Sequence, residues 1–289
     1  MSEGRFLTTH VGSLPRGEAL KTLMFAREAG AAVDGSAFGA RIEEAVTDVV
    51  ARQVAAGLDI LNDGEQSKPS YATYIKDRLT GFGGESGSYV LQEVEDYPGG
   101  KLRMASDEGR KHRRAPACTG AVAVKDMSAA VRDAEALKDA LAAHPGRQGF
   151  MSAASPGVTA LFFANEHYAR DEDYLVALAD ALRPEYEAIA AAGLILQIDC
   201  PDLAMGRHTQ FRDLSLNQFR ERLMLNVEML NRATVNIAPE QMRIHLCWGN
   251  YPGPHTRDVP MRDIVDLVWR ARPQGIQFEA ANPRHAHEF

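Results

Sequence analysis

The sequence predicts an α/β protein built as a TIM-type (β/α)8 barrel. Strand-like runs alternate with amphipathic helical patterns along the chain, and 289 residues suffice for a barrel of about 250 residues. The rival, an open doubly wound sheet, would carry a Gly-x-Gly-x-x-Gly motif after its first strand, and none is found there. No linker or low-complexity tract divides the chain, so we expect one domain spanning residues 1–289.

The strands are predicted from short apolar runs rich in β-branched residues and bounded by turn residues. These runs lie at residues 6–14, 58–62, 115–122, 149–155, 194–198, 243–247 and 275–279. This is one strand fewer than a closed barrel needs, so the chain is expected to lack the last strand of the barrel.

Helices are predicted at 36–56, 172–192 and 215–235 from apolar residues at helical spacing. The first two run into Gly57 and Gly193, which are suited to end a helix just before a strand. Within 172–192, Pro184 predicts a kink or a break. Ser215 and Gln218 form a capping-box pattern at the start of the third helix.

Residues 81–114 are rich in glycine and charge and are too long for a simple connection. We interpret them as an excursion over one face of the barrel, a candidate substrate lid.

The composition limits the function. The net charge is −7, and the basic cluster at 109–114 is too short for a nucleic-acid surface, so no nucleic-acid partner is expected. No run of about 18 apolar residues predicts a membrane span, and the N-terminus shows no signal peptide. Three cysteines do not form a disulfide framework, which favours a reducing, cytoplasmic location.

Chemically capable side chains stand where the predicted strands end, which is where barrel enzymes gather their active sites. They are Ser13, Asp63, Glu65, Asp199, Cys200, His245, Cys247, Glu279 and Asn282.

His245 and Cys247 are two residues apart on one predicted strand, so their side chains point to the same side. Lying about 7 Å apart along the strand, an imidazole and a thiolate suit two corners of a zinc site. Glu279 on the next strand could supply a third ligand. The alternative is a core cysteine beside a hydrogen-bonded histidine.

Other candidates have simpler explanations. Cys118 is expected to be a core residue, whereas Cys200, directly after Asp199, could be a ligand or a substrate contact. Asp199 follows an apolar strand and needs a partner, such as an arginine, backbone amides or a substrate amine. His285 and His287 form a metal-like pair that we interpret as a solvated or interface segment.

Taken together, the motifs resemble the catalytic barrel of the cobalamin-independent methionine synthase family, in order along nearly the whole chain. The matching segments are HVGSLPR at 10–16, NDGEQSKPSYATYIKDRLTGF at 62–82, QIDCPDLAM at 197–205, HLCWGN at 245–250 and FEAANPR at 278–284.

The resemblance implies a zinc-dependent methyl transfer to the thiol of homocysteine or a related thiol, with methyl-tetrahydrofolate as the donor. By this resemblance His245, Cys247 and Glu279 are zinc ligands. The expected substrate-binding residues are Ser13, Glu65, Asp199, Cys200 and Trp248, of which Asp199 and Glu65 are the expected catalytic residues. The partners are then small molecules, and a homo-oligomer is left open.

The chain also departs from the family. Cys200 stands where the family has a glutamate, and no histidine-bearing strand or Asp-Cys-Gly segment follows Glu279. We therefore expect the sequence to be a fragment of a longer chain; the alternative is that a partner subunit or a rearranged element closes the barrel. Two alternative functions stay open: zinc-dependent alkyl transfer to another thiol such as coenzyme M, and a non-catalytic barrel that binds an amino acid or a pterin.

Overall fold

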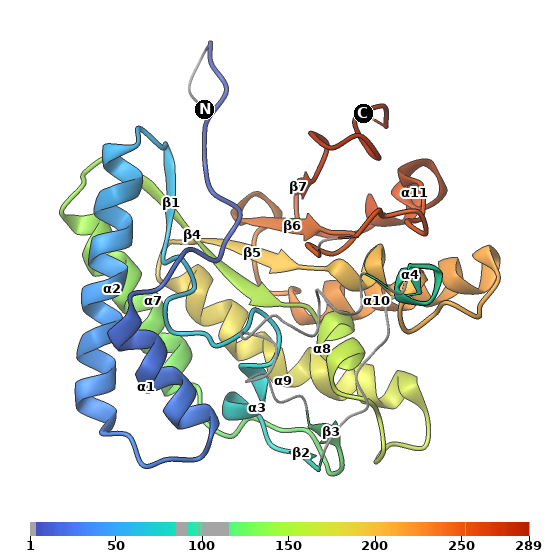
Figure 1. Ribbon diagram of the computed structural model, residues 1–289, viewed down its shortest axis with the longest axis horizontal. Helices are drawn as coiled ribbons and strands as arrows, with labels where there is room; N and C mark the ends of the chain where they lie inside the picture. The colour runs from blue at the N-terminus through green and yellow to red at the C-terminus, as the bar shows by residue number, and fades with distance from the viewer. Residues whose placement is uncertain (1–3, 85–91, 98, 100–115, 252, 289) are drawn as a thin grey trace.

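A parallel sheet of five strands, in the order β1-β4-β5-β6-β7, forms the centre of the protein (Figure 1). The computed structural model describes residues 4–84, 92–97, 99, 116–251 and 253–288. The strands of this sheet are β1 (Ile60–Asn62), β4 (Gln148–Ala154), β5 (Ile195–Asp199), β6 (Met242–Leu246) and β7 (Gly275–Phe278). They confirm the strands predicted at 58–62, 149–155, 194–198, 243–247 and 275–279.

The predicted helices are present with nearly the predicted bounds. The longer helices are α1 (Glu18–Glu28), α2 (Gly35–Ala55), α7 (Ser128–Ala142), α8 (Pro156–Phe162), α9 (Asp171–Ala191) and α10 (Leu216–Ala233). The short ones are α3 (Ile75–Arg78), α4 (Glu93–Asp96) and α11 (Val265–Val268), with 3-10 turns η1 (Pro201–Leu203), η2 (Met205–His208), η3 (Pro239–Gln241) and η4 (Met261–Asp263).

Local sequence explains where the helices begin and end. Asp34 caps α2 by accepting from the backbone N–H of Ala37 at 2.7 Å. The capping box predicted for Ser215 and Gln218 is present at the start of α10. Pro184 lies inside α9, which continues through it without a break.

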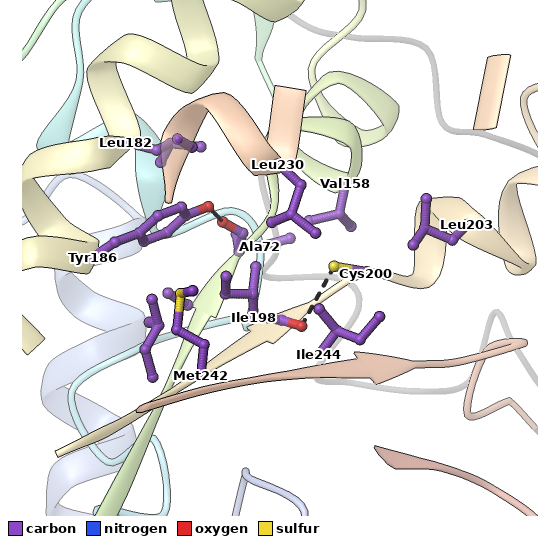
Figure 2. Packing of buried hydrophobic residues seen from close by; sticks show 14 of the residues in the cluster. Ala72, Val158, Leu182, Tyr186, Ile198, Cys200, Leu203, Leu230, Met242 and Ile244 are labelled. Carbon is purple, nitrogen blue, oxygen red and sulfur yellow. Dashed lines mark hydrogen bonds between the residues drawn. The ribbon is translucent and has the colours of Figure 1, made fainter. Parts of the chain in front are cut away.

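The core lies between the sheet and the helices on one of its faces. Helix α7 packs on β4, and α9 packs on β4 and β5. Figure 2 shows Tyr186 of α9 and Val158 of α8 beside Ile198 of β5 and Ile244 of β6. Burial of each such aliphatic side chain stabilises the fold by roughly 1.5–3 kcal/mol, so this layer fixes the face of the sheet that is left for the site.

The strand predicted at 6–14 is reduced to an isolated parallel bridge between Thr9 and Ile60. The carbonyl of Thr8 accepts from the backbone N–H groups of both Asp59 and Ile60, so pairing with β1 stops there. Further along, the carbonyl of Val11 accepts from the side chain of Gln197 at 2.7 Å instead of a neighbouring strand. This segment therefore crosses the sheet on the face opposite the helices.

The strand predicted at 115–122 does not join the parallel sheet. Instead β3 (Ala117–Cys118) pairs antiparallel with β2 (Phe82–Gly83). Gly81, with φ of 91°, accepts from the backbone N–H groups of Thr119 and Gly120, which turns the chain back on itself. Closure into a full barrel stays a prediction.

Most of the excursion predicted at 81–114, and with it the candidate lid, lies outside the described residues. The part that is described includes α4. Among the described residues, no helix is both long enough and apolar enough to cross a membrane.

Candidate functional site

A cavity of about 580 Å³ opens where β5 and β6 end, on the sheet face opposite the core. Five predicted site residues line it: Ser13, Glu65, Asp199, His245 and Cys247. The carboxyl ends of parallel strands are where α/β proteins bind their ligands. The structure thus brings together residues that are as much as 234 positions apart in the sequence.

Glu65 reaches the cavity from a tight turn that follows β1. The side chain of Asn62 accepts from the backbone N–H of Gly64 at 2.7 Å, and that of Asp63 accepts from Glu65 N–H at 3.1 Å. Gly64 and Glu65 both have positive φ, of 62° and 53°. A left-handed glutamate is strained, and such strain is kept where the surroundings hold it. The turn therefore fixes the Glu65 carboxylate, which is buried.

Asp199 forms a buried carboxylate pair with Glu65. Gln197, two residues earlier on the same face of β5, donates to Asp199 Oδ1 at 3.1 Å and to Ser152 Oγ at 3.2 Å. Burial, followed by repulsion from Glu65, raises the pKa of Asp199, while the buried ammonium of Lys68 opposes this rise. A pair of carboxylates in this setting favours a cationic group in the cavity.

His245 and Cys247 line the cavity from the neighbouring strand β6, where His245 is the register partner of Asp199. Burial lowers the pKa of His245 to about 4 and raises the pKa of Cys247 to about 11. His245 is thus a neutral imidazole, which is the form that binds metals, and its buried Nδ1 has no hydrogen-bond partner within the described part of the chain. The Cys247 sulfur accepts from the backbone N–H of Gly249 at 3.2 Å.

Glu279 lies near this pair but does not line the cavity. His245 is paired with Gln277 in the β6–β7 register, so Glu279 follows on the same sheet face as Cys247. Its carboxylate raises the pKa values of both His245 and Cys247, but its side chain is exposed. Within the described part of the chain, no three His, Cys, Asp or Glu side chains are arranged to hold a metal ion.

Cys200 and Trp248, which we expected to contact substrate, do not reach the cavity. Cys200 lies in the hydrophobic core beside Ile198 and Leu203 (Figure 2), and its thiol donates to the carbonyl of Ile198 at 3.4 Å. Adjacent strand residues face opposite sides, so Asp199 and Cys200 cannot share the site. Trp248 is buried, donates from Nε1 to the carbonyl of Val259 and stacks on His285.

The two tail histidines have different environments. His285 is buried, and its ring nitrogens contact Asp258 at 2.9 Å and Glu288 at 2.6 Å, so the prediction of a solvated or interface segment is wrong for it. His287 is exposed. Cys118 is buried, as predicted.

Sequence reasoning missed several residues of the cavity. Tyr251 and Met205 line the cavity, and behind it Gln197 donates hydrogen bonds to the carboxylate of Asp199 and to Ser152. Side chains two residues apart on a strand share one face, so Gln197, which precedes Asp199 by two residues, could have been predicted to lie beside it. Tyr251 and Met205 come from irregular segments whose path no local pattern predicts.

Comparisons with known proteins agree with this arrangement. Residues 6–144 match the family described as cobalamin-independent synthase, catalytic domain. A 75-residue segment is 36% identical to the 5-methyltetrahydropteroyltriglutamate–homocysteine methyltransferase of Aeromonas salmonicida, covering 26% of this chain and 10% of that protein. The methionine synthase of Saccharolobus solfataricus is 24% identical over 260 residues, which are 89% of this chain and 68% of that protein.

Solved structures share the fold. A B12-independent methionine synthase from Shewanella sp. W3-18-1, in complex with selenomethionine, has a TM-score of 0.55 at 20% identity, covering 75% of this chain and 54% of the other. A Listeria monocytogenes protein described as a vitamin-B12-independent methionine synthase has a TM-score of 0.58 at 18% identity, covering 85% and 66%. Together with the sequence matches, these likenesses relate the chain to the cobalamin-independent methionine synthases: residues 6–144 resemble their catalytic domain in sequence, and most of the chain shares their fold.

Proposed function

We propose that this protein is a zinc-dependent S-methyltransferase that transfers a methyl group from a folate-type donor to the thiol of homocysteine or a related amino-acid thiol. The single observation that carries the proposal is the cavity itself. His245 and Cys247, whose side chains can bind a metal, line the same space as the buried carboxylates Glu65 and Asp199. An amino-acid thiol has a sulfur for the first pair and an ammonium for the second.

The amino end of the substrate would bind at the carboxylate pair. An ammonium placed there compensates the repulsion between Glu65 and Asp199, and Gln197 holds Asp199 in position. Ser13, which is exposed and lines the cavity, would bind the substrate carboxylate. The same charges disfavour coenzyme M, because its sulfonate is an anion and it carries no ammonium.

The thiol end would lie against His245 and Cys247. Nδ1 of His245, which has no hydrogen-bond partner among the described residues, and the cavity-lining sulfur of Cys247 fit two positions of a zinc site. Glu279, two residues after the Gln277 that pairs with His245, would supply the third donor. When bound, zinc would lower the pKa of the substrate thiol, so that a thiolate is present at neutral pH.

In the transfer, a carbon–sulfur bond forms and the bond between the methyl carbon and the donor nitrogen breaks. The leaving amine takes up a proton, since an unprotonated amine is a poor leaving group. Holding both reactants in one cavity replaces a bimolecular encounter with a positioned one. The T-shaped pair of Tyr71 and Phe162, with ring centroids 5.7 Å apart, offers an aromatic wall for a pterin ring.

The known activity named for the relatives supports this donor and acceptor, but the chain matches the first of these relatives over only 10% of their length. The whole activity is therefore a proposal for this chain. We also propose that residues 1–289 form one domain, a (β/α)8-type barrel that lacks its last strand. We further propose that it works in the cytoplasm, where its three free cysteines stay reduced.

The test combines metal content with product formation. Elemental analysis of the purified protein should find about one zinc per chain, as expected for a three-ligand catalytic site. Incubation with homocysteine and 5-methyl-tetrahydrofolate, as monoglutamate and triglutamate, should give methionine by mass spectrometry. Both zinc and product should be lost in His245→Ala and Cys247→Ala. A folded, metal-free protein that binds methionine without turnover would instead identify a non-catalytic binding barrel.

A further inference from the structure

We propose that Glu93 is a positioning residue that holds the wall of the cavity next to Cys247. Glu93 belongs to α4 and accepts hydrogen bonds from Tyr251 and from residues 255–257. These lie in the segment of residues 249–251 and 253–257, here called the Tyr251 loop. The importance of this contact for methyl transfer rests on the proposed function. The contact itself rests on geometry alone.

The Glu93 carboxylate is saturated with donors from the Tyr251 loop. Its side chain is only 2% exposed. It accepts from Tyr251 Oη at 2.9 Å, His255 N at 3.0 Å, Thr256 Oγ1 at 3.2 Å and Arg257 N at 3.1 Å. A buried carboxylate is costly unless it is fully hydrogen-bonded, so α4 and the Tyr251 loop stabilise each other.

The bonds hold the loop in a strained conformation. His255 has a φ of 55°, which is unfavourable for a side chain of this size. Its backbone N–H is fixed by Glu93, and its Nδ1 is 3.0 Å from Asp258. Glu65 and His255 are the non-glycine residues with positive φ in the described part of the chain. Strained residues often occur at functional sites, as Glu65 does in this cavity. The strain at His255 therefore indicates that the Tyr251 loop, which borders the cavity, is also held in place for a function.

The loop transmits this constraint to Cys247. The Tyr251 ring lines the cavity and packs over Gly249, where an added Cβ would lie 3.0 Å from Tyr251 Cδ1. Gly249, with φ of 101°, donates its N–H to the Cys247 sulfur at 3.2 Å. Glu93 thus fixes Tyr251, Tyr251 covers Gly249, and Gly249 fixes the thiol.

The experiment measures the rate at which iodoacetamide alkylates Cys247 in the full-length, metal-free protein, by peptide mass spectrometry. Cys118 and Cys200 are buried and serve as internal references, whereas Cys247 is partly accessible. In Glu93→Ala the rate at Cys247 should rise about tenfold, since losing charged hydrogen bonds favours the open loop by at least that factor. The rates at Cys118 and Cys200 should not change.

Asp96→Asn is the matched control. Asp96 lies on the same short helix and bonds Arg257 at 2.8 Å, but at an exposed site. Surface ion pairs contribute little to stability, so Cys247 in Asp96→Asn should be alkylated at a rate within about twofold of the wild-type rate. A purely structural role of Glu93 would lower the melting temperature without selective labelling of Cys247.

Tyr251→Phe keeps the test decisive if Glu93→Ala does not fold, because it removes one of the four donors and keeps the ring. An increase of about threefold is expected from the loss of one hydrogen bond. If both variants fold and alkylate Cys247 at the wild-type rate, the proposal is overturned. If Glu93→Ala does not fold, a wild-type alkylation rate in Tyr251→Phe alone overturns it. Because the readout needs neither zinc nor methyl transfer, an inactive wild-type protein would reject the proposed function and still leave this inference open to a clear result.

Discussion

Gly12 lies directly against the carboxylate of Glu65, and a Cβ added to Gly12 would be 2.6 Å from Glu65 Oε1. That distance is well inside van der Waals contact, so only glycine fits while the carboxylate keeps its place. The N-terminal segment and the turn after β1 therefore define one half of the cavity together.

Gly12→Ala should displace Glu65 and weaken binding of the amino group of a substrate. We expect the affinity for methionine, measured by calorimetry, to fall on the order of tenfold, because one charged hydrogen bond is lost. Gly17→Ala is the control, since a Cβ at Gly17 meets nothing within 4 Å. Equal affinities of the two variants would contradict the role given to Gly12.

The two cysteines near the ends of β5 and β6 should respond differently to substitution. Cys247→Ala should abolish zinc binding, whereas Cys200→Ala should keep it and destabilise the fold by about 1–2 kcal/mol, as expected for a small core residue. Zinc content and urea unfolding of both variants measure this. If Cys200→Ala loses zinc while its fold stays intact, Cys200 is part of the zinc site and this prediction is wrong.

Asp202 should make the free energy of unfolding depend on pH. Burial raises the pKa of Asp202 to about 6, although Ser155 and Asn226 donate hydrogen bonds to it. The folded state holds this proton more tightly than the unfolded chain does. The stabilisation is therefore complete below about pH 4, which is the ordinary pKa of an aspartate in the unfolded chain. It is lost as the pH rises through the pKa of the folded state.

The pH effect can be isolated with Asp202→Asn, which cannot ionise. Relative to this variant, the wild type should lose on the order of 2 kcal/mol between pH 4 and pH 7 in urea unfolding. Asp213→Asn, at a carboxylate whose side chain is 94% exposed, should follow the wild-type profile. Parallel curves for the wild type and Asp202→Asn would disprove the assignment.

Arg78 joins three helices through buried ion pairs. It donates to Glu185 of α9 at 2.7 Å and also to Asp133 of α7, and all three side chains are buried. Arg78→Met should destabilise the fold by about 3–5 kcal/mol, because two buried carboxylates lose the positive charge that pairs with them.

A surface arginine gives the comparison. Arg232 contacts Asp180 at 2.8 Å, but both side chains are more than two fifths exposed. Arg232→Met should cost less than about 1 kcal/mol. Chemical denaturation measures both variants, and similar losses would show that the Arg78 cluster is not the stabilising contact proposed.

The sequence predicted the sheet best where strands are buried on both faces. β4 and β5 are buried along nearly their whole length, because helices cover one face and the cavity segments the other, and polar residues such as Gln197 and Asp199 occur on the cavity face. It failed at 115–122, since pairing with β2 depends on a contact with Gly81 that no local pattern contains.

The site was predictable where side-chain alternation applies. His245 and Cys247 lie on one face as their spacing requires, and the same rule would have excluded Cys200 beside Asp199. Glu93 was not predictable, because it acts across 158 positions on Tyr251. Such long-range pairing has no signature in a single sequence.

The side chain of Gln53 has a further consequence for the behaviour of the protein at high concentration. From α2 it donates to the carbonyl of Asn62 and accepts from the N–H of the same residue, just as a neighbouring strand would. The carbonyl of Thr8 also accepts from the backbone N–H groups of Asp59 and Ile60. The outer edge of β1 therefore presents few free backbone groups, which disfavours aggregation by strand pairing between molecules at this edge.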